Sequence, residues 1–276
     1  HRANLCLRPN SQTLARMGGI MKRVMLTVAY DGTNYHGWQL QPHVTTVESV
    51  LNETLSALLK EDIKVIGASR TDTGVHALGN IAVFDTQARM PAEKFSYALN
   101  QRLPEDIRIQ SSREVPLDFH PRRQDSRKTY EYKIQNSDFP MPVLRLYTHF
   151  TYVPLDVGLM RRAAGYLKGT HDFKSFCSIH TMAETTVRTI FDADVEKTGD
   201  VITIRVTGSG FLYNMVRIIA GTLMEVGRGS IAPEHITDIL EACDRTKAGP
   251  TAPACGLTLV KYEFIHSGMP GRDKWG

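Results

Sequence analysis

One carboxylate in this sequence has neighbours that suit it to chemistry. Asp72 lies within the stretch Gly-Ala-Ser-Arg-Thr-Asp-Thr-Gly-Val-His-Ala, residues 67–77, and Arg70 precedes it by two positions. A guanidinium close by favours the ionised form of a carboxyl group. An ionised carboxylate that is held in place can act as a nucleophile or as a base. We therefore predict that Asp72 is a catalytic residue and that Arg70 assists it.

Short strands are expected to position this stretch. Apolar runs rich in β-branched residues flank it at 63–66 and 81–84, and such runs are typical of strands. Three glycines within and beside the stretch supply the backbone freedom that a tight turn needs. Asp72 is therefore expected on a loop between two strands of one sheet.

Two other interpretations stay open on the residues alone. Asp, Thr and Gly are turn formers, so Asp72 can be a purely structural turn residue. Asp-Thr-Gly at 72–74 is also the tripeptide of aspartic proteases, in which two carboxylates share one proton. The sequence holds a single Asp-Thr-Gly, so a protease would have to be a symmetric dimer. Arg70 opposes a shared proton because it favours two ionised carboxylates.

The whole stretch resembles the catalytic loop of the tRNA pseudouridine synthase A family. Further blocks resemble that family in family order, between residue 21 and about residue 264. They lie at 30–39 (YDGTNYHGWQ), 127–132 (RKTYEY), 169–177 (GTHDFKSFC), 210–217 (GFLYNMVR) and 255–257 (CGL). The resemblance implies an isomerase that converts uridine to pseudouridine at positions 38, 39 and 40 of the tRNA anticodon stem-loop. An inactive tRNA-binding protein of the same fold is the alternative.

The resemblance also implies roles for particular side chains. Asp72 is the catalytic carboxylate, Tyr130 stacks on the extruded uracil, and Arg217 pairs with Asp72 and orients it. On the residues alone, Tyr130 is equally a packing residue of a strand, and Arg217 a solvated side chain on the polar face of a helix. The isomerisation needs no group donor and no redox change, so neither a cofactor nor a metal is expected, and the sequence holds no motif for either.

Basic and polar side chains are the candidates for contacts with RNA. Phosphate contacts position RNA without reading its sequence. The candidates are Gln39, His76, Arg122, Arg123, Arg127 and Lys128. For His76, a hydrogen bond that holds the loop is the competing role. Of the formal net charge of +4, three charges come from arginines within residues 1–20, so bulk charge does not predict a nucleic-acid partner.

The pattern of elements predicts an α+β fold. Strands are expected at 24–30, 63–66, 81–84, 107–109, 129–135, 186–195, 201–206 and 257–264, and helices at 45–60, from 91, from 156, at 211–226 and from 233. They form two similar strand-helix-strand halves, residues 21–125 and 126–266, between an extension at 1–20 and a tail at 267–276. The resemblance implies that the halves join their antiparallel sheets, flanked by helices, with an active-site cleft between them.

Partners and setting follow partly from composition and partly from the resemblance. The four cysteines form no Cys-x-x-Cys pair, which favours a reducing, cytoplasmic setting. No apolar run approaches the length of a membrane span. The resemblance implies tRNA as the partner and a homodimer with one RNA lying across both subunits.

Overall fold

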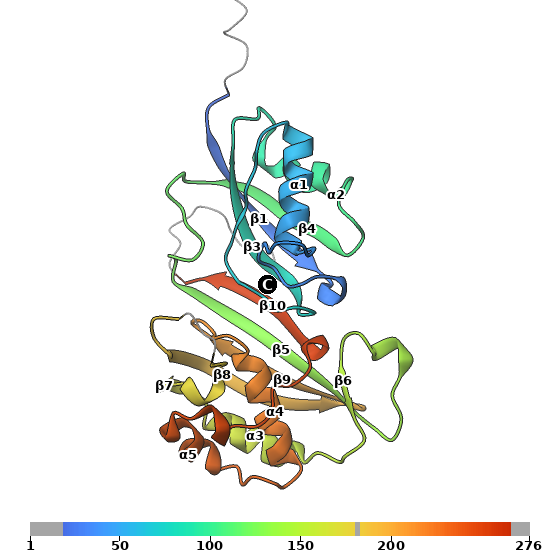
Figure 1. Ribbon diagram of the computed structural model, residues 1–276, viewed down its shortest axis with the longest axis vertical. Coiled ribbons are helices and arrows are strands. Elements are labelled where there is room, and N and C mark those ends of the chain that lie inside the picture. Colours follow the sequence, from blue (N-terminus) through green and yellow to red (C-terminus); the bar gives the residue numbers. More distant parts are fainter. Residues whose placement is uncertain (1–18, 180–182, 266–276) are drawn as a thin grey trace, which may run out of the picture.

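The computed structural model describes residues 19–179 and 183–265. The extension expected at 1–20 lies outside the described residues except for its last two positions, and the tail expected at 267–276 lies wholly outside them. Within the described residues, ten strands form one mixed sheet and helices pack against it (Figure 1). The predicted α+β class is confirmed.

The bounds of the elements show where prediction and structure agree. The strands are β1 Lys22–Tyr30, β2 Ile66–Gly67, β3 His76–Thr86, β4 Ile107–Val115, β5 Ser126–Asn136, β6 His149–Thr151, β7 Gly169–Asp172, β8 Val187–Thr198, β9 Val201–Gly208 and β10 Leu257–Phe264. The α-helices are α1 Val47–Leu59, α2 Phe95–Asn100, α3 Val157–Gly165, α4 Met215–Gly227 and α5 His235–Ala242. Every predicted helix and strand overlaps one of these, whereas β6 and β7 were not predicted.

One strand joins the two halves of the sheet. The order is β4-β1-β3-β10-β5-β9-β8-β7, so β10, the last strand within the described residues, lies between β3 and β5 (Figure 1). β10 is antiparallel to β5 but parallel to β3, where Thr258 lies opposite His76 and Leu259 opposite Ala77. The predicted joining of two sheets is confirmed, but the joint itself is parallel. A strand that arrives through a long connection can run parallel to its neighbour, whereas a tight hairpin imposes antiparallel pairing.

One apolar core extends through both halves. Its buried side chains come from all five α-helices and from one face of the sheet. Strand β9 shows how the sequence selects that face, since Ile202, Ile204 and Val206 are buried while the residues between them are partly exposed. A smaller cluster that includes Val83 and Phe119 lies apart from this core.

Helix α1 begins at Val47, two residues after the expected start at 45. The spacing of Thr45 and Glu48 would also suit a capping box, but the box is formed by Thr46 and Ser49, whose side chains each accept from the other's backbone N–H. Glu48 instead accepts a hydrogen bond from the backbone N–H of Leu40 at 2.7 Å. The carboxylate thereby fixes the loop that precedes the helix.

Helix α4 is shorter at its start than the predicted span of 211–226. It begins at Met215, because Asn214 has a left-handed backbone with φ of 60°. Asparagine adopts this conformation more readily than most residues. Residues 211–214 therefore form a turn before the helix, and Arg217 falls in the first helical turn.

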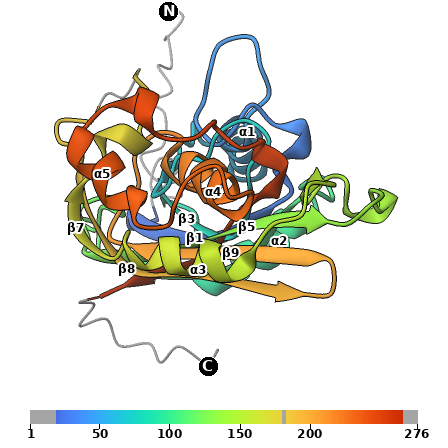
Figure 2. The same cartoon turned by 90° about the horizontal axis from the view of Figure 1, so that it is seen from below.

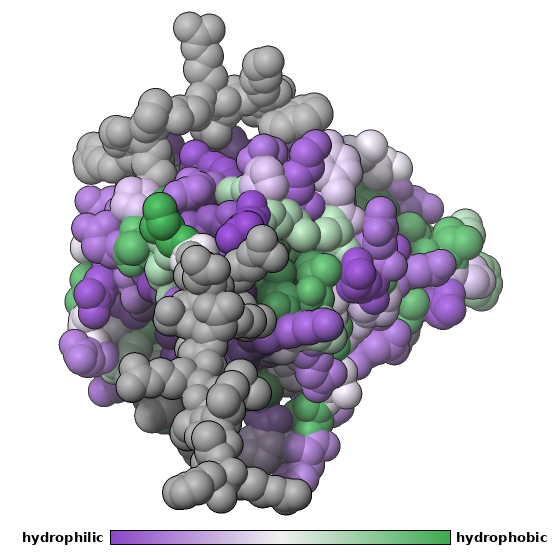
Figure 3. Space-filling view, turned by 90° about the horizontal axis from the view of Figure 1, so that it is seen from above, coloured by the Kyte–Doolittle hydropathy of each residue, from purple (hydrophilic) through white to green (hydrophobic). Residues whose placement is uncertain are grey.

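One loop extends away from the rest of the molecule. Residues 137–148, between β5 and β6, reach outward in two perpendicular views (Figures 1 and 2). Phe139 and Val143 on this loop are 82% and 74% exposed. On the face seen from above, hydrophilic and hydrophobic side chains are interspersed (Figure 3). Of the helices in residues 19–179 and 183–265, none has the length and apolar character that crossing a bilayer requires.

Candidate active site

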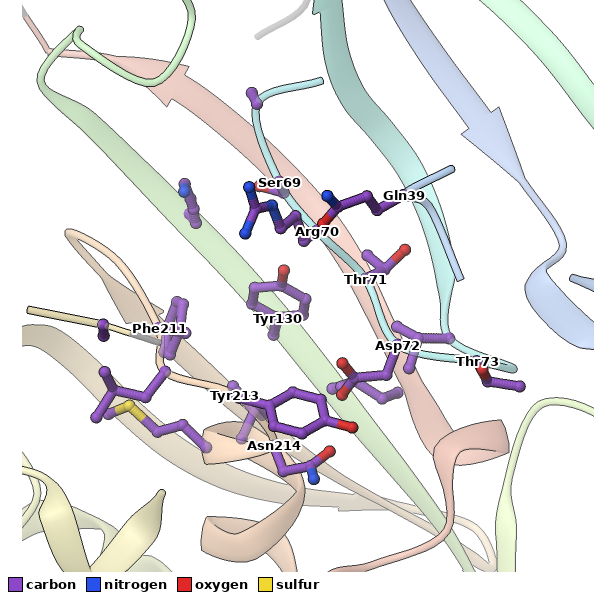
Figure 4. Close-up of a pocket in the computed structure, with 18 of the residues that line it drawn as sticks. Gln39, Ser69, Arg70, Thr71, Asp72, Thr73, Tyr130, Phe211, Tyr213 and Asn214 are labelled. Carbon is purple, nitrogen blue, oxygen red and sulfur yellow. The ribbon is translucent and has the colours of Figure 1, made fainter. Parts of the chain in front are cut away.

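A cleft of about 680 Å³ opens between the two halves of the sheet. The first half contributes residues 68–73, the loop that carries Asp72, and the second half contributes β5 and the turn at 211–214 (Figure 4). Asp72, Tyr130 and Tyr213 all line this space. The structure thus brings the predicted carboxylate and the predicted aromatic platform to one cleft.

Hydrogen bonds from three segments hold the Asp72 loop. The Tyr30 hydroxyl lies 2.7 Å from the Thr71 hydroxyl, and the Trp38 backbone N–H donates to the Thr71 carbonyl at 3.0 Å. The Asn80 side chain accepts from the Ser69 N–H and donates to the Ser69 carbonyl, at 3.2 and 2.9 Å. Both sides of residue 70 are therefore tied to neighbouring elements, and the loop presents Asp72 on a rigid base.

Gly37 approaches this loop more closely than any other residue type would allow. Its φ is +79°, and a Cβ atom there would lie 2.5 Å from the Thr71 carbonyl oxygen. A side chain at 37 would therefore displace the backbone next to Asp72. Gly37 belongs to the block at 30–39 that resembles the family. This close contact is a physical reason for a glycine at that position.

Arg217 reaches Asp72 from the opposite half. Its Nη1 lies 3.7 Å from Asp72 Oδ2, with only 18% and 21% of the two side chains exposed. The guanidinium also donates through Nε to the Ala252 carbonyl at 2.7 Å and through Nη1 to Asn214 Oδ1 at 3.0 Å. The arginine is therefore held on its own side of the cleft and aimed at the carboxylate.

The charge state of Asp72 reflects two opposing effects. Burial raises the pKa of Asp72 above its ordinary value, and the nearby Arg217 charge works against that rise. Among the described residues, Arg217 is the side chain within ion-pair distance of Asp72. Arg70 also lines the cleft but lies on the side of Tyr130 away from Asp72 (Figure 4). Arg217, not Arg70, is thus the electrostatic partner of the carboxylate.

Tyr130 is a buried ring at the floor of the cleft. It is 7% exposed, and Phe211 packs edge-on against it with ring centroids 5.1 Å apart. Burial raises the pKa of the Tyr130 hydroxyl well above its ordinary value, so the ring stays neutral. Tyr213, 49% exposed, stands between Tyr130 and Asn214 in the close-up (Figure 4). Two further aromatic rings thus accompany the predicted one.

The predicted RNA contacts divide into two groups. Gln39, Arg122 and Lys128 line the cleft. Arg123 and Arg127 are exposed but do not line it, and the Arg127 guanidinium lies 4.8 Å from the Phe191 ring centroid instead. Successive residues of a strand point to opposite faces, so Lys128 faces the cleft while Arg127 faces away from it.

His76 lies among backbone groups behind the cleft and is 4% exposed. Its Nδ1 accepts from the Gly32 N–H at 3.0 Å and lies 3.1 Å from Asp31 Oδ1. Its Nε2 lies 3.0 and 3.2 Å from the carbonyl oxygens of Leu146 and Cys255. A side chain in this position holds the loop together, and it does not line the cleft.

Phe211 and Tyr213 were missed as site residues. The helix predicted at 211–226 includes both residues, whereas the structure places them in the turn before α4. Glycine and asparagine are common in turns. The signal that could have identified the two aromatic residues is that they lie between Gly210 and Asn214. An aromatic residue in a turn beside a cleft is exposed for contact with a ligand.

Fold and cleft together define an α+β protein with one carboxylate at the centre of its candidate active site. The family model for tRNA pseudouridine synthase matches residues 26–122 and 163–264. The chain belongs to the tRNA pseudouridine synthase family. Both matched segments contain cleft residues, with Asp72 in the first and Tyr213 in the second, and the second also contains Arg217, the ion-pair partner of Asp72.

Named relatives are similar over nearly their whole length. A protein of Acetivibrio thermocellus named tRNA pseudouridine synthase A is 50% identical over 244 residues, which cover 88% of this chain and 100% of the relative. One of the same name from Thermoanaerobacter sp. is 49% identical with the same coverage of both chains. The tRNA pseudouridine synthase A 2 of Clostridium tetani is 48% identical over 245 residues, 88% of this chain and 99% of the relative.

Proposed function

We propose that this protein converts uridine to pseudouridine in tRNA, at positions 38, 39 and 40 of the anticodon stem-loop, with Asp72 as its catalytic carboxylate. The observation that carries the proposal is the meeting of Asp72 and Tyr130 in one cleft, with Arg217 within 3.7 Å of the carboxylate. Membership of the tRNA pseudouridine synthase family supports the reaction class. The positions in tRNA rest on the resemblance of the sequence blocks.

The reaction is an internal rearrangement whose atoms balance without a co-reactant. The bond from C1′ to N1 breaks, the uracil turns, and a bond forms from C5 to C1′. The hydrogen on C5 leaves as a proton, and N1 gains a proton. One carboxylate suffices to start this sequence by attack on C1′, by attack on the base or by removing a proton from C2′.

We assign to Arg217 the role of orienting Asp72. Its positive charge opposes the effect of burial on the carboxyl group, which favours the ionised form that any of the three steps requires. Its bonds to the Ala252 carbonyl and the Asn214 side chain fix the guanidinium before substrate arrives. A preorganised partner of this kind costs no rearrangement during the reaction.

We assign to Tyr130 the role of holding the extruded base. Base–aromatic stacking is worth about 1–3 kcal/mol per base, and a flipped base must be held outside the RNA stack during chemistry. The neutral ring with Phe211 edge-on beside it supports this role. Tyr213 on the facing turn is placed to cover the base from the other side.

An aspartic protease is the less supported reading of this site. Such an enzyme needs a second carboxylate close enough to share a proton. Within the described part of the chain, the ion-pair neighbour of Asp72 is Arg217, a cation. An inactive tRNA-binding protein is the remaining competitor, and it predicts binding without turnover.

A homodimer and a cytoplasmic setting are also proposed. The resemblance supports a dimer that binds one RNA across both subunits, and the molecular mass in solution tests it. The tRNA substrate and the free cysteines Cys243 and Cys255 support a reducing, cytoplasmic setting.

The deciding experiment is tritium release from tRNA labelled at C5 of uridine. Forming the bond from C5 to C1′ forces the label to leave, so release measures isomerisation directly. Wild type should release tritium, whereas Asp72→Asn, which keeps shape and removes charge, should release at least about 1,000-fold less with unchanged tRNA affinity. Binding without release by wild type would favour the inactive protein, and full release by Asp72→Asn would remove Asp72 from the mechanism.

A further inference from the structure

Four basic side chains meet in the cleft at a distance from Asp72. Arg70, Arg122, Lys128 and Arg188 all line it, and we call them the basic cluster. They come from four segments, namely the Asp72 loop, the connection before β5, β5 itself and β8. Arg122 and Arg188 both act on Lys128 through space, as Arg70 does on Arg122. Like charges brought together from separate segments repel one another unless an anion joins them.

The chain itself supplies little compensation for this charge. Within residues 19–179 and 183–265, no carboxylate lies within ion-pair distance of a cluster member. Glu48 acts on Arg122 through space, but its Oε2 already accepts the Leu40 N–H. Other cations on the same sheet do have carboxylate partners, as the contacts of Arg205 with Glu131 and of Lys261 with Glu263 show.

Lys128 is the cluster member whose charge burial disfavours most. It lies on β5 between Gly208 and Tyr262 of the neighbouring strands, with Nζ 5.3 Å from the Tyr262 ring centroid. Burial lowers the pKa of Lys128 to about 8, and repulsion from Arg122 and Arg188 adds to the effect. A half-buried ammonium group without a counter-ion opposes folding, so a bound anion at this point would stabilise it.

The two cluster arginines on either side are already oriented. Arg122 donates through Nε to the Gly67 carbonyl at 2.8 Å. Arg188 donates through Nη1 to the carbonyls of Thr185 and Val187 at 2.8 and 2.6 Å. A guanidinium has five N–H donors, so each retains donors for a ligand while its plane is held by the backbone.

We infer that the basic cluster binds the phosphodiester group that borders the target nucleotide. Lys128 and Tyr130 are two residues apart on one face of β5, which places them about 7 Å apart along the strand. If Tyr130 holds the base, an anion at Lys128 lies within the span of the same nucleotide. Phosphate oxygens accept strong hydrogen bonds from both guanidinium and ammonium groups. This inference rests on the proposed function, because it takes RNA as the ligand.

The test is to remove the negative charge from one phosphate at a time. Anticodon stem-loop RNAs would carry a single neutral methylphosphonate either 5′ or 3′ to the target uridine, or in the stem as a control. Binding would be measured to Asp72→Asn protein, in which turnover is expected to be too slow to interfere. At one of the two bordering positions, the neutral group should weaken binding about tenfold, as loss of a charge-assisted contact does, and the stem position should have no effect.

A double-mutant comparison assigns that effect to the cluster. Combined with Lys128→Met, the neutral linkage should cause no further loss, because the contact is already gone. Lys133→Met, on the same strand but beside Glu131, is the matched control and should leave the tenfold effect intact. Fully additive losses for Lys128→Met and both bordering linkages would overturn the inference.

The pH dependence of binding gives a second readout. Above about pH 8, Lys128 must take up a proton to bind phosphate, so affinity should fall by up to about tenfold per pH unit. Burial keeps the hydroxyls of Tyr130 and Tyr262 neutral by raising their pKa values, and arginine stays charged. Lys128→Arg should therefore bind at pH 7 like the parent and lose this fall. An identical fall in Lys128→Arg would contradict the inference.

The two proposals fail in different ways. Tritium release by wild type together with additive methylphosphonate effects would leave the isomerase proposal standing and overturn the phosphate site. Coupling between Lys128 and one phosphate without any tritium release would support the phosphate site and overturn the isomerase proposal.

Discussion

The buried hydroxyl groups of Tyr30 and Thr71 lie 2.7 Å apart, although 41 positions separate the two residues. Tyr30 ends β1, and Thr71 directly precedes Asp72. The Tyr30 ring also packs against Trp38, with centroids 5.8 Å apart, and the Trp38 N–H donates to the Thr71 carbonyl. The backbone before the carboxylate is thus placed by the sheet and by the loop after β1 together.

Tyr30→Phe tests this placement by removing a single hydroxyl. The ring still fills its site, but the Thr71 hydroxyl loses its buried partner, which costs about 1–2 kcal/mol of stability. Turnover should fall several-fold while tRNA affinity is unchanged, because the loop carrying Asp72 loosens. Urea unfolding and single-turnover rates measure the two effects. Tyr97→Phe, at a ring 69% exposed on α2, is the control and should change neither quantity.

Asp72→Asn is expected to stabilise the protein near neutral pH. Burial raises the folded-state pKa of Asp72 above its ordinary 3.8, so the folded state binds the proton more tightly than the unfolded state. The contribution of this group to stability therefore falls as pH rises from its ordinary pKa through the folded value, and at pH 7 the ionised form opposes folding. Removing the charge should raise the free energy of unfolding by about 0.5–2 kcal/mol.

Unfolding curves at two pH values check the sign of this change in the free energy of unfolding. The gain from Asp72→Asn should be present at pH 7 and should shrink below about pH 4, where Asp72 is protonated in both states. Asp62→Asn, at a side chain 86% exposed, should give no gain at either pH. If Asp72→Asn raised the stability equally at both pH values, the gain would not come from removal of a buried charge.

Arg217→Ala should lower turnover by about 100-fold and leave tRNA affinity nearly unchanged. Removal of the cation also takes away the effect that lowers the pKa of Asp72, so that pKa should rise further. The acid limb of the rate profile should then move to higher pH. Arg217→Lys keeps the charge and should restore the position of that limb. If turnover and affinity fell equally, Arg217 would be a phosphate contact instead.

Gly67→Ala should disrupt the base of the Asp72 loop. A Cβ atom at 67 would lie 2.1 Å from Nε1 of Trp38, a side chain that is 1% exposed and cannot move aside. The expected cost is about 3 kcal/mol or more, with loss of turnover. At Gly79 the nearest atom to a new Cβ is a Thr27 methyl at 3.4 Å, so Gly79→Ala should be tolerated. Equal unfolding midpoints for the two variants would contradict this account.

Local patterns predicted much of the fold. The hairpin at 198–200 turns where Gly199 has φ of 58°, and Asp156 caps α3 by accepting from the Leu159 N–H. Both features depend on neighbours in sequence. β6 was missed because three residues carry no periodicity, and β2 is shorter than the apolar run at 63–66 because Ile63 and Val65 are buried in the core outside any strand.

The site could be predicted only where motifs carried it. Asp72 and Arg217 are 145 positions apart, and no periodicity relates them; the resemblance to the family supplied the pairing. Arg127 and Lys128 were taken together as RNA contacts because they are adjacent, but strand alternation sends them to opposite faces. The turn at Asn214 depends on one left-handed residue, which sequence patterns rarely specify.

The place of β10 has a consequence for the order of biosynthesis. Until residues 257–264 have emerged from the ribosome, β3 and β5 have no strand between them, and each presents an unpaired edge. The two halves of the cleft therefore come into register only after residue 264 has been synthesised. A chain cut short before Leu257 should possess every proposed catalytic side chain and still lack a working site. Translation that stops before this point should therefore yield an inactive, aggregation-prone product rather than a partly active one.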